Sequence, residues 1–308
     1  MWFRVAILSA AAAALLGTTP PPAASGLKLA FYNIRGGIGL SALRGRPAPF
    51  AATTNCTDRS KPLNAWGAGA VQRTLTAALS DPDIVALGLA ESWKASCASP
   101  ERVRETLGWK AASDGRNGVA LVARYGFTDE QWRQLDTARN KNPKDTAWVL
   151  RAVVCTTARC DRKATTYVAH WYATGPDARE TYALQARQTV EFMQAASGGK
   201  PHVLVGDLNV WTASGRVCRQ TPNGDAAIPV LTNAGYIDAW PAIHGAQEGY
   251  TGMLNRAGCG APEGSAWKRI DYAWSSTGYL PVDIIRFGVV PAGDAAPSDH
   301  YGIIVTYP

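Results

Sequence analysis

The chain has 308 residues, of which 46% are hydrophobic and 18% are charged. This length can bury a substantial core within one domain, and the absence of repeats and low-complexity linkers in the sequence excludes a repeat array or a string of domains. The formal net charge of +7 favours an anionic partner such as nucleic acid, phospholipid or a cell surface, although modest basicity also serves solubility.

The first 25 residues have the pattern of a secretory signal peptide. Arg4 forms a short basic region, residues 5–17 are an apolar run, and residues 23–25 are small, as at a cleavage site. The run is too short for a comfortable membrane span, and a retained amphipathic anchor is the alternative. We therefore expect a secreted mature protein.

After the signal peptide, short β-rich runs alternate with segments of helical spacing. The runs predict strands at residues 27–34, 83–90, 118–124, 147–155, 165–171, 201–206, 268–274, 282–289 and 301–307. Helical patterns predict helices at residues 71–79, from Pro100, at 177–196 and at 226–234. Residues 37–62 contain Pro and Gly and predict an irregular surface loop.

Strands occur both singly between helices and as a hairpin, whose arms are residues 147–155 and 165–171. This mixture predicts an α/β (α+β) protein with mixed or antiparallel-rich sheets, and not a doubly wound parallel fold. No glycine-rich phosphate-binding motif follows a strand, so no nucleotide cofactor is expected. One domain, residues 26–308, accounts for the mature chain, and a monomer is expected.

The mature chain contains six cysteines, and an even number in an exported protein predicts three disulfides. They are Cys56, Cys97, Cys155, Cys160, Cys218 and Cys259. No CxxC pair is present, which argues against a structural zinc site. The residues alone leave all pairings open, although Cys155 and Cys160 are close enough to close a hairpin loop.

Several predicted strands end in, or are followed by, a polar residue suited to metal or phosphate chemistry. These residues are Asn33, Glu91, His170, Asp207, Asn209, Asp271, Asp299 and His300. Strand ends at one rim of a sheet bring such groups together, and buried charges need partners. Carboxylate ligands without thiolates suit Mg²⁺, Mn²⁺ or Ca²⁺. An Asp beside a His fixes the imidazole tautomer.

Each of these residues also has an ordinary structural explanation. The sequence GDLN around Asp207 is compatible with a helix cap or an Asx turn. Glu91 taken alone is compatible with a surface acid, His170 with a structural histidine, and the Asp299–His300 pair with a cap on the last strand. The order of the whole set along the chain favours the functional interpretation.

That ordered set resembles the endonuclease/exonuclease/phosphatase superfamily of deoxyribonuclease-like phosphoesterases. The resemblance extends over residues 27–307 and is carried by GDLN at 206–209, SDH at 298–300, NIR at 33–35, RIDY at 269–272, Glu91 and His170. It implies a four-layered α/β sandwich, with two facing mixed sheets between helices and the active site at one end.

The resemblance also implies a role for each residue of the set. Glu91 would be the principal ligand of Mg²⁺ (or Mn²⁺ or Ca²⁺), supported by Asn33 and Asp299. Asp207 would orient or deprotonate the attacking water, and Asn209 would help to position it. Asp271 and His300 would form a pair acting on the phosphoryl group. His170 would add a second imidazole on the phosphate or leaving-group side.

Three features depart from the family pattern or leave it open. Ala90 stands before Glu91 where the family often has Gln, and Leu208 replaces an aromatic residue in a position expected to pack inward. Residues 37–62 do not align. The resemblance to secreted deoxyribonucleases implies the pairs Cys218–Cys259 and Cys155–Cys160, which leaves Cys56 with Cys97.

The sequence leaves three functions open: two enzymatic activities of this fold on different substrates, and a role as a binding protein. A nuclease acting on DNA is favoured by the basic charge, by Arg35 after the first strand, and by Trp93 and Trp211, which are placed to stack on a base unless they pack in the core. A phospholipid or phosphoinositide phosphoesterase would need an exposed apolar loop. A secreted binding or toxin subunit with vestigial catalytic residues is a third possibility, which the intact polar set disfavours.

Overall fold

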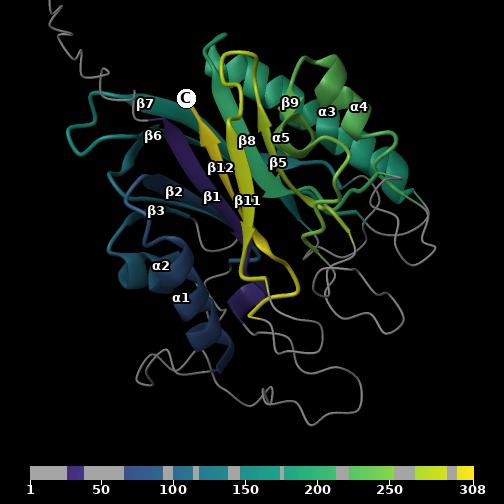
Figure 1. Cartoon of the computed structure of the whole chain (residues 1–308). Coiled ribbons are helices and arrows are strands. Elements are labelled where there is room, and N and C mark those ends of the chain that lie inside the picture. Colours follow the sequence, from purple (N-terminus) through teal and green to yellow (C-terminus); the bar gives the residue numbers. More distant parts are fainter. Residues whose placement is uncertain are drawn as a thin grey trace, which may run out of the picture.

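Two six-stranded sheets pack face to face between layers of helices (Figure 1). In this computed structural model the described residues are 26–37, 66–92, 100–113, 118–137, 146–173, 177–212, 222–252, 268–289 and 297–308. Among them, no helix is long and apolar enough to cross a membrane. The predicted signal peptide, Trp93 and most of the loop at residues 37–62 lie outside the described residues.

The first sheet has the strand order β11-β12-β1-β2-β4-β3. Its strands are β1 (Leu27–Asn33), β2 (Ile84–Ala90), β3 (Lys110–Ala112), β4 (Val119–Ala123), β11 (Asp283–Phe287) and β12 (Gly302–Tyr307). β1 and β2 are parallel, whereas the other neighbours in this sheet are antiparallel.

The second sheet has the strand order β5-β6-β7-β8-β10-β9. Its strands are β5 (Phe127–Leu135), β6 (Ala147–Cys155), β7 (Lys163–His170), β8 (His202–Asp207), β9 (Ile237–Asp238) and β10 (Asp271–Ser275). Only β7 and β8 are parallel in this sheet, as the described strands show.

Helices cover the outer face of each sheet. Those on the first sheet are α1 (Trp66–Ala78) and α2 (Pro100–Leu107). Those on the second sheet are α3 (Ala178–Ser197) and α4 (Ile228–Asn233). The short helix α5 (Ala239–His244) contacts β10 and β11, and the 3-10 turn η1 (Arg35–Gly37) follows β1. The predicted four-layered sandwich is thereby confirmed.

Side-chain alternation along the central strands divides the core into layers. On β1, Leu29 and Phe31 join the apolar cluster between the sheets, whereas Ala30 and Tyr32 join the cluster beneath α1 and α2. Successive side chains of a strand point to opposite faces, so a strand covered on both faces is apolar throughout. This explains why the central strands are visible in the sequence as continuous apolar runs.

The sequence patterns do not predict β3, β5, β9 or α5. β5 is an edge strand whose side chains are mostly exposed, and of its nine residues only Leu135 is buried. It therefore lacks the apolar run that marks a strand with a covered face. The helix α5 has six residues, which is too short for helical spacing to be recognised; Asp238 caps it by accepting a hydrogen bond from Trp240 N.

One predicted disulfide is present in the described residues. Cys155 and Cys160 are bonded across the turn between β6 and β7, with their Cα atoms 4.7 Å apart. The prediction of this pair is confirmed. The other four predicted disulfide cysteines lie outside the described residues; they are Cys56, Cys97, Cys218 and Cys259.

Strand register brings the predicted site residues to one end of the sandwich. Across the parallel pair β1–β2, Asn33 lies opposite Ala90, which precedes Glu91. In the second sheet Asp207 lies opposite both His170 on β7 and Asp271 on β10. Parallel strands that end together, and antiparallel strands that start there, therefore place these side chains at a common rim.

Gly206 shows how little space this register leaves. A Cβ atom at this position would lie 2.4 Å from the carbonyl oxygen of Ala169 on β7. We expect Gly206→Ala to lower the free energy of unfolding by about 1–3 kcal/mol, because the neighbouring strand has to move. Urea denaturation measures this, with Lys163→Ala, at an exposed position on β7, as the control. Equal stability of both variants would contradict the expectation.

Candidate active site

The carboxylate of Asp207 lies at the centre of the rim and is 1% exposed. Its Oδ2 accepts a hydrogen bond of 2.9 Å from Asn33 Nδ2, and its Oδ1 accepts one of 2.9 Å from Asn209 N. Burial raises the pKa of the Asp207 carboxyl, against the opposing charge of His300. The two hydrogen bonds fix the orientation of the carboxylate, and burial increases its affinity for a proton.

Two imidazoles approach the same oxygen. His170 Nε2 and His300 Nε2 each lie 3.7 Å from Asp207 Oδ2. Both rings are buried, and they come from different sheets: His170 ends β7, and His300 precedes β12. The structure thus brings these three predicted catalytic residues together.

His300 is paired with Asp271. His300 Nδ1 lies 2.9 Å from Asp271 Oδ2 and 3.1 Å from Oδ1, so this nitrogen carries the donated hydrogen. Burial alone would lower the pKa of His300, but the charges of Asp271 and Asp207 raise it well above its ordinary value. The pair therefore favours a protonated ring whose Nε2 faces the centre of the site.

His170 has the opposite protonation tendency. Burial, and then the nearby charge of His300, lower the pKa of His170 to about 4. Near neutral pH one imidazole is thus neutral and the other favours the charged form. Two titratable groups with opposed shifts in one site are suited to separate roles in acid–base chemistry.

The acidic part of the site adjoins this centre. Glu91 follows β2 in a left-handed backbone conformation with φ of 51°, and its side chain accepts a 3.3 Å hydrogen bond from Asn33 Nδ2. Burial, and then the charge of Asp299, raise the pKa of Glu91. Arg35 Nε lies 3.7 Å from Asp299 Oδ2, which makes it the nearby cation on this side.

A divalent cation fits the acidic part. Asp299 Oδ1 is buried and has no hydrogen-bond partner among the described residues. Glu91 lies close enough to Asp299 for the negative charge of Asp299 to raise the pKa of the Glu91 carboxyl. Oxygen donors such as those of Glu91, Asp299 and Asn33 suit a hard cation. Asp299 Oδ2 faces Arg35 and its Oδ1 lies 3.9 Å from His300 Nε2, so an ion would add to these partners.

A second group of potential ligands is less suited to a metal. Asp207, Asp271 and His300 have ligand atoms within 4.8 Å of one another, close enough to hold an ion. However, both oxygens of Asp271 are engaged by His300 Nδ1. The Asp271 carboxylate is therefore already bonded to His300, whereas Asp299 Oδ1 has no hydrogen-bond partner among the described residues.

The loop after β8 is held in one conformation. Asn209 has φ of 54°, and its Nδ2 donates to Trp171 O at 2.9 Å. Asn223, which no sequence motif marks, donates from Nδ2 to Asn209 O and accepts from Trp211 N. A lone loop asparagine carries no sequence signal, because its function depends on a contact 14 residues away.

The predicted substrate-binding residues have different environments. The side chain of Arg35 is 34% exposed, so it is accessible at the rim. Trp211 is only 8% exposed, and Lys268 Nζ lies 3.5 Å from the centre of its ring. This environment favours packing of Trp211 over stacking on a substrate. Trp93 lies outside the described residues.

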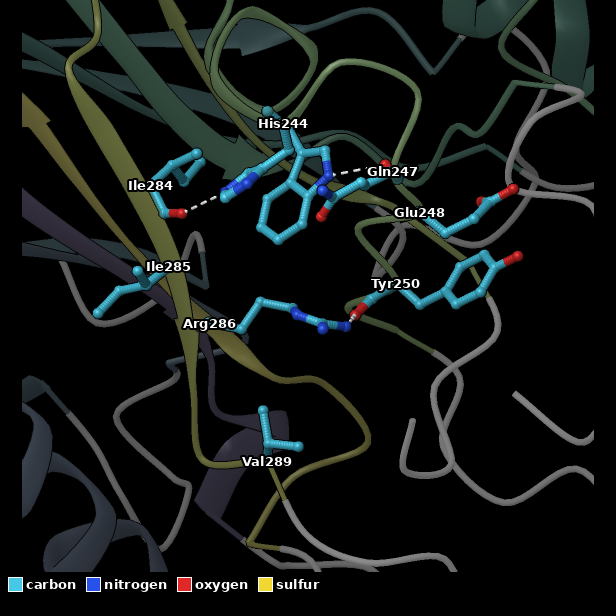
Figure 2. A pocket seen from close by; sticks show the side chains of 9 residues that line it. His244, Gln247, Glu248, Tyr250, Ile284, Ile285, Arg286 and Val289 are labelled. Carbon is cyan, nitrogen blue, oxygen red and sulfur yellow. Dashed lines mark hydrogen bonds between the residues drawn. The ribbon is translucent and has the colours of Figure 1, made fainter. Parts of the chain in front are cut away.

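A separate cavity of 620 Å³ lies beside β11 (Figure 2). The predicted site residues are not among its described lining residues. Three hydrogen bonds join its lining residues: His244 Nε2 donates to Ile284 O at 2.7 Å, Arg286 Nη1 donates to Tyr250 O at 2.9 Å, and Trp240 Nε1 donates to Gln247 O at 2.9 Å. The first of these covers a backbone carbonyl of an edge strand, and the second fixes the segment that leads to residue 251.

The described chain is thus a four-layered sandwich with paired histidines and clustered acids at one end. A sequence profile of the endonuclease/exonuclease/phosphatase family matches residues 30–300, and the chain belongs to this family. The chain is therefore a phosphoester hydrolase of that class, as the sequence predicts. The family is typically dependent on divalent metals. No curated protein matches the sequence.

Solved structures share the fold at low identity. D. rerio TDP2 in complex with a single-stranded DNA product has a TM-score of 0.57 at 16% identity, over 92% of this chain and 99% of that chain. A Bacteroides thetaiotaomicron mannosyl-6-phosphatase has a TM-score of 0.59 at 18% identity, over 92% of this chain and 99% of that chain. The human Nocturnin catalytic domain with a bound sulfate has a TM-score of 0.58 at 14% identity, over 92% of this chain and 94% of that chain.

The bond between Asp271 and His300 predicts a shared defect. Asp271→Asn and His300→Ala should each lower kcat by about 10²–10⁴-fold, because both remove an oriented, protonated imidazole. Turnover is measured beside the melting temperature, with Asp283→Asn, an exposed carboxylate on β11, as the control. Near-normal turnover with a lowered melting temperature would assign the pair to packing.

Proposed function

We propose that the protein is an exported, divalent-metal-dependent phosphodiesterase that hydrolyses DNA. The observation that carries this proposal is the arrangement around Asp207: one buried carboxylate, two imidazoles with opposed protonation tendencies, and an adjoining pair of acids. This arrangement supplies a group to orient water, a group to protonate an oxygen and a place for a cation.

Glu91, Asn33 and Asp299 would hold the ion, for which Mg²⁺ is the first choice. When bound, it would neutralise negative charge on the phosphoryl group. Asn33 Nδ2 donates to both Glu91 Oε1 and Asp207 Oδ2, so one amide sets the position of the metal ligand relative to the carboxylate that would orient water. Arg35 would contribute a further positive charge at the rim.

The acid–base roles follow from the protonation tendencies. The ionised carboxylate of Asp207 would accept a proton from the attacking water, since burial raises the proton affinity of this group. His300, held by Asp271, would present a protonated Nε2 to a phosphoryl or leaving oxygen. His170 would donate a neutral hydrogen bond, and Asn209 would position the water.

The net charge of +7 and the accessible Arg35 support a polyanionic substrate. The single-stranded DNA product in the TDP2 structure is in keeping with this choice. The disulfide Cys155–Cys160 and the pattern of residues 1–25 support export to an oxidising compartment.

A phospholipid substrate is the second candidate, and one observation favours it. The exposed large hydrophobic residues of the described chain all fall within one ten-residue segment, as Leu280, Val282, Ile285 and Val289. Exposed apolar side chains grouped in this way are typical of contact with a lipid or protein surface. A lipid arm therefore belongs in any substrate assay.

A substrate panel tests the proposal. Purified mature protein with Mg²⁺ should cleave plasmid DNA faster than RNA, sphingomyelin or phosphoinositides, and chelator should abolish cleavage. Glu91→Gln should weaken Mg²⁺ binding in calorimetry and lower turnover, because a neutral amide replaces a charged ligand. Glu191→Gln, an exposed position on α3, is the control.

Full activity in chelator, or unchanged Mg²⁺ binding by Glu91→Gln, would contradict the metal site. Preference for sphingomyelin or phosphoinositides over DNA would replace the first candidate by the second.

A further inference from the structure

The Asp271–His300 pair joins two sheets that share no ladder of hydrogen bonds. Asp271 starts β10 in the second sheet, whereas His300 lies two residues before Gly302, where β12 of the first sheet begins. In the described strands, β10 pairs only with β8 and β9, and β12 only with β1 and β11. The distance between the two functional groups therefore depends on whatever connects these strand starts.

Thr251 makes that connection and is 1% exposed. Its Oγ1 accepts hydrogen bonds from the backbone N–H of Ile270, at 3.2 Å, and of Asp271, at 3.1 Å. Its carbonyl oxygen accepts a bond of 2.6 Å from Tyr301 N, the residue after His300. One residue thus binds the backbone on both sides of the pair.

The neighbouring residues strengthen this bridge. Gly252 forms β-bridges with both Lys268 and His300, and a Cβ atom at Gly252 would lie 2.3 Å from Ile270 Cδ1. Ser298 Oγ donates to Asn33 O at 2.6 Å and accepts from His300 N at 3.3 Å, which ties His300 to its own sheet. The bridge at residues 251–252 ties it to the other sheet.

We propose that Thr251 is a positioning residue for hydrolysis: its hydroxyl oxygen fixes the start of β10 so that the Asp271 carboxylate meets His300 Nδ1. This inference rests on the proposed function, in which His300 acts on the phosphoryl group. Without the hydroxyl, two buried N–H groups lose their acceptor, and the strand start shifts to satisfy them. A misplacement of about 1 Å near reacting groups costs on the order of 10²-fold in rate.

A graded series of substitutions tests the role of Thr251. Thr251→Val keeps the shape but removes the acceptor, Thr251→Cys retains a weak acceptor, and Thr251→Ser retains a full one. With Mg²⁺ and bis(4-nitrophenyl) phosphate or plasmid DNA, kcat should fall by about 10–100-fold for Val, less for Cys and least for Ser, with little change in KM. In an Asp271→Asn background, Thr251→Val should cause almost no further loss.

Ser276→Ala is the matched control. Ser276 Oγ accepts a 2.9 Å hydrogen bond from His202 N at the opposite end of β10, so its loss removes the same kind of bond away from the site. A second readout does not depend on turnover: the low-field proton resonance of the His300–Asp271 hydrogen bond, assigned by its absence in His300→Ala. Thr251→Val should shift or abolish it, and Ser276→Ala should not.

The inference is wrong if Thr251→Val lowers the melting temperature as Ser276→Ala does but leaves both kcat and the resonance unchanged. Should Thr251→Val not fold, equal turnover of the Ser and Cys variants would overturn it. Absence of hydrolysis by the unmodified protein would contradict the proposed function instead, and the resonance would still decide the role of Thr251.

Discussion

The buried carboxylate of Asp207 is the group around which the rest of the site is organised. A charge removed from water is costly unless hydrogen-bond donors and counter-charges surround it. Asn33 from β1 and Asn209 from the loop after β8 donate to it and two imidazoles approach it, which offsets part of this cost, although burial still raises the pKa of the carboxyl. Because these partners come from both sheets, satisfying one carboxylate requires both sheets to end at the same rim.

Asn33 links the two halves of the site. An amide nitrogen has two hydrogens, and here one side chain donates to Glu91 and to Asp207, while its Oδ1 accepts from Arg35 N at 2.9 Å. The carboxylates of Glu91 and Asp207 are therefore both held by a single small side chain. Asn33 is in turn anchored through its carbonyl by Ser298.

Sequence patterns predicted the central strands and the residues gathered at the rim, because buried strands are continuous apolar runs and a polar residue at their end stands out. The edge strand β5 was not predicted, because buried and exposed side chains do not alternate along it. Thr251 and Asn223 escaped because a single polar loop residue acts only through contacts far away in sequence. The strand predicted from residue 268 begins at Asp271, since Ile270 N bonds to the Thr251 side chain.

The bond from Ser298 to Asn33 has a consequence for the order of folding. Its partners are 265 residues apart, and β12, which lies between β1 and β11, is the last strand of the chain. Contacts of such separation form late, because the entropy of closing the loop is lost before they are made. During synthesis, a chain lacking its final residues has neither His300 nor Asp299. The rim around Asp207 therefore stays incomplete until β12 has joined the first sheet.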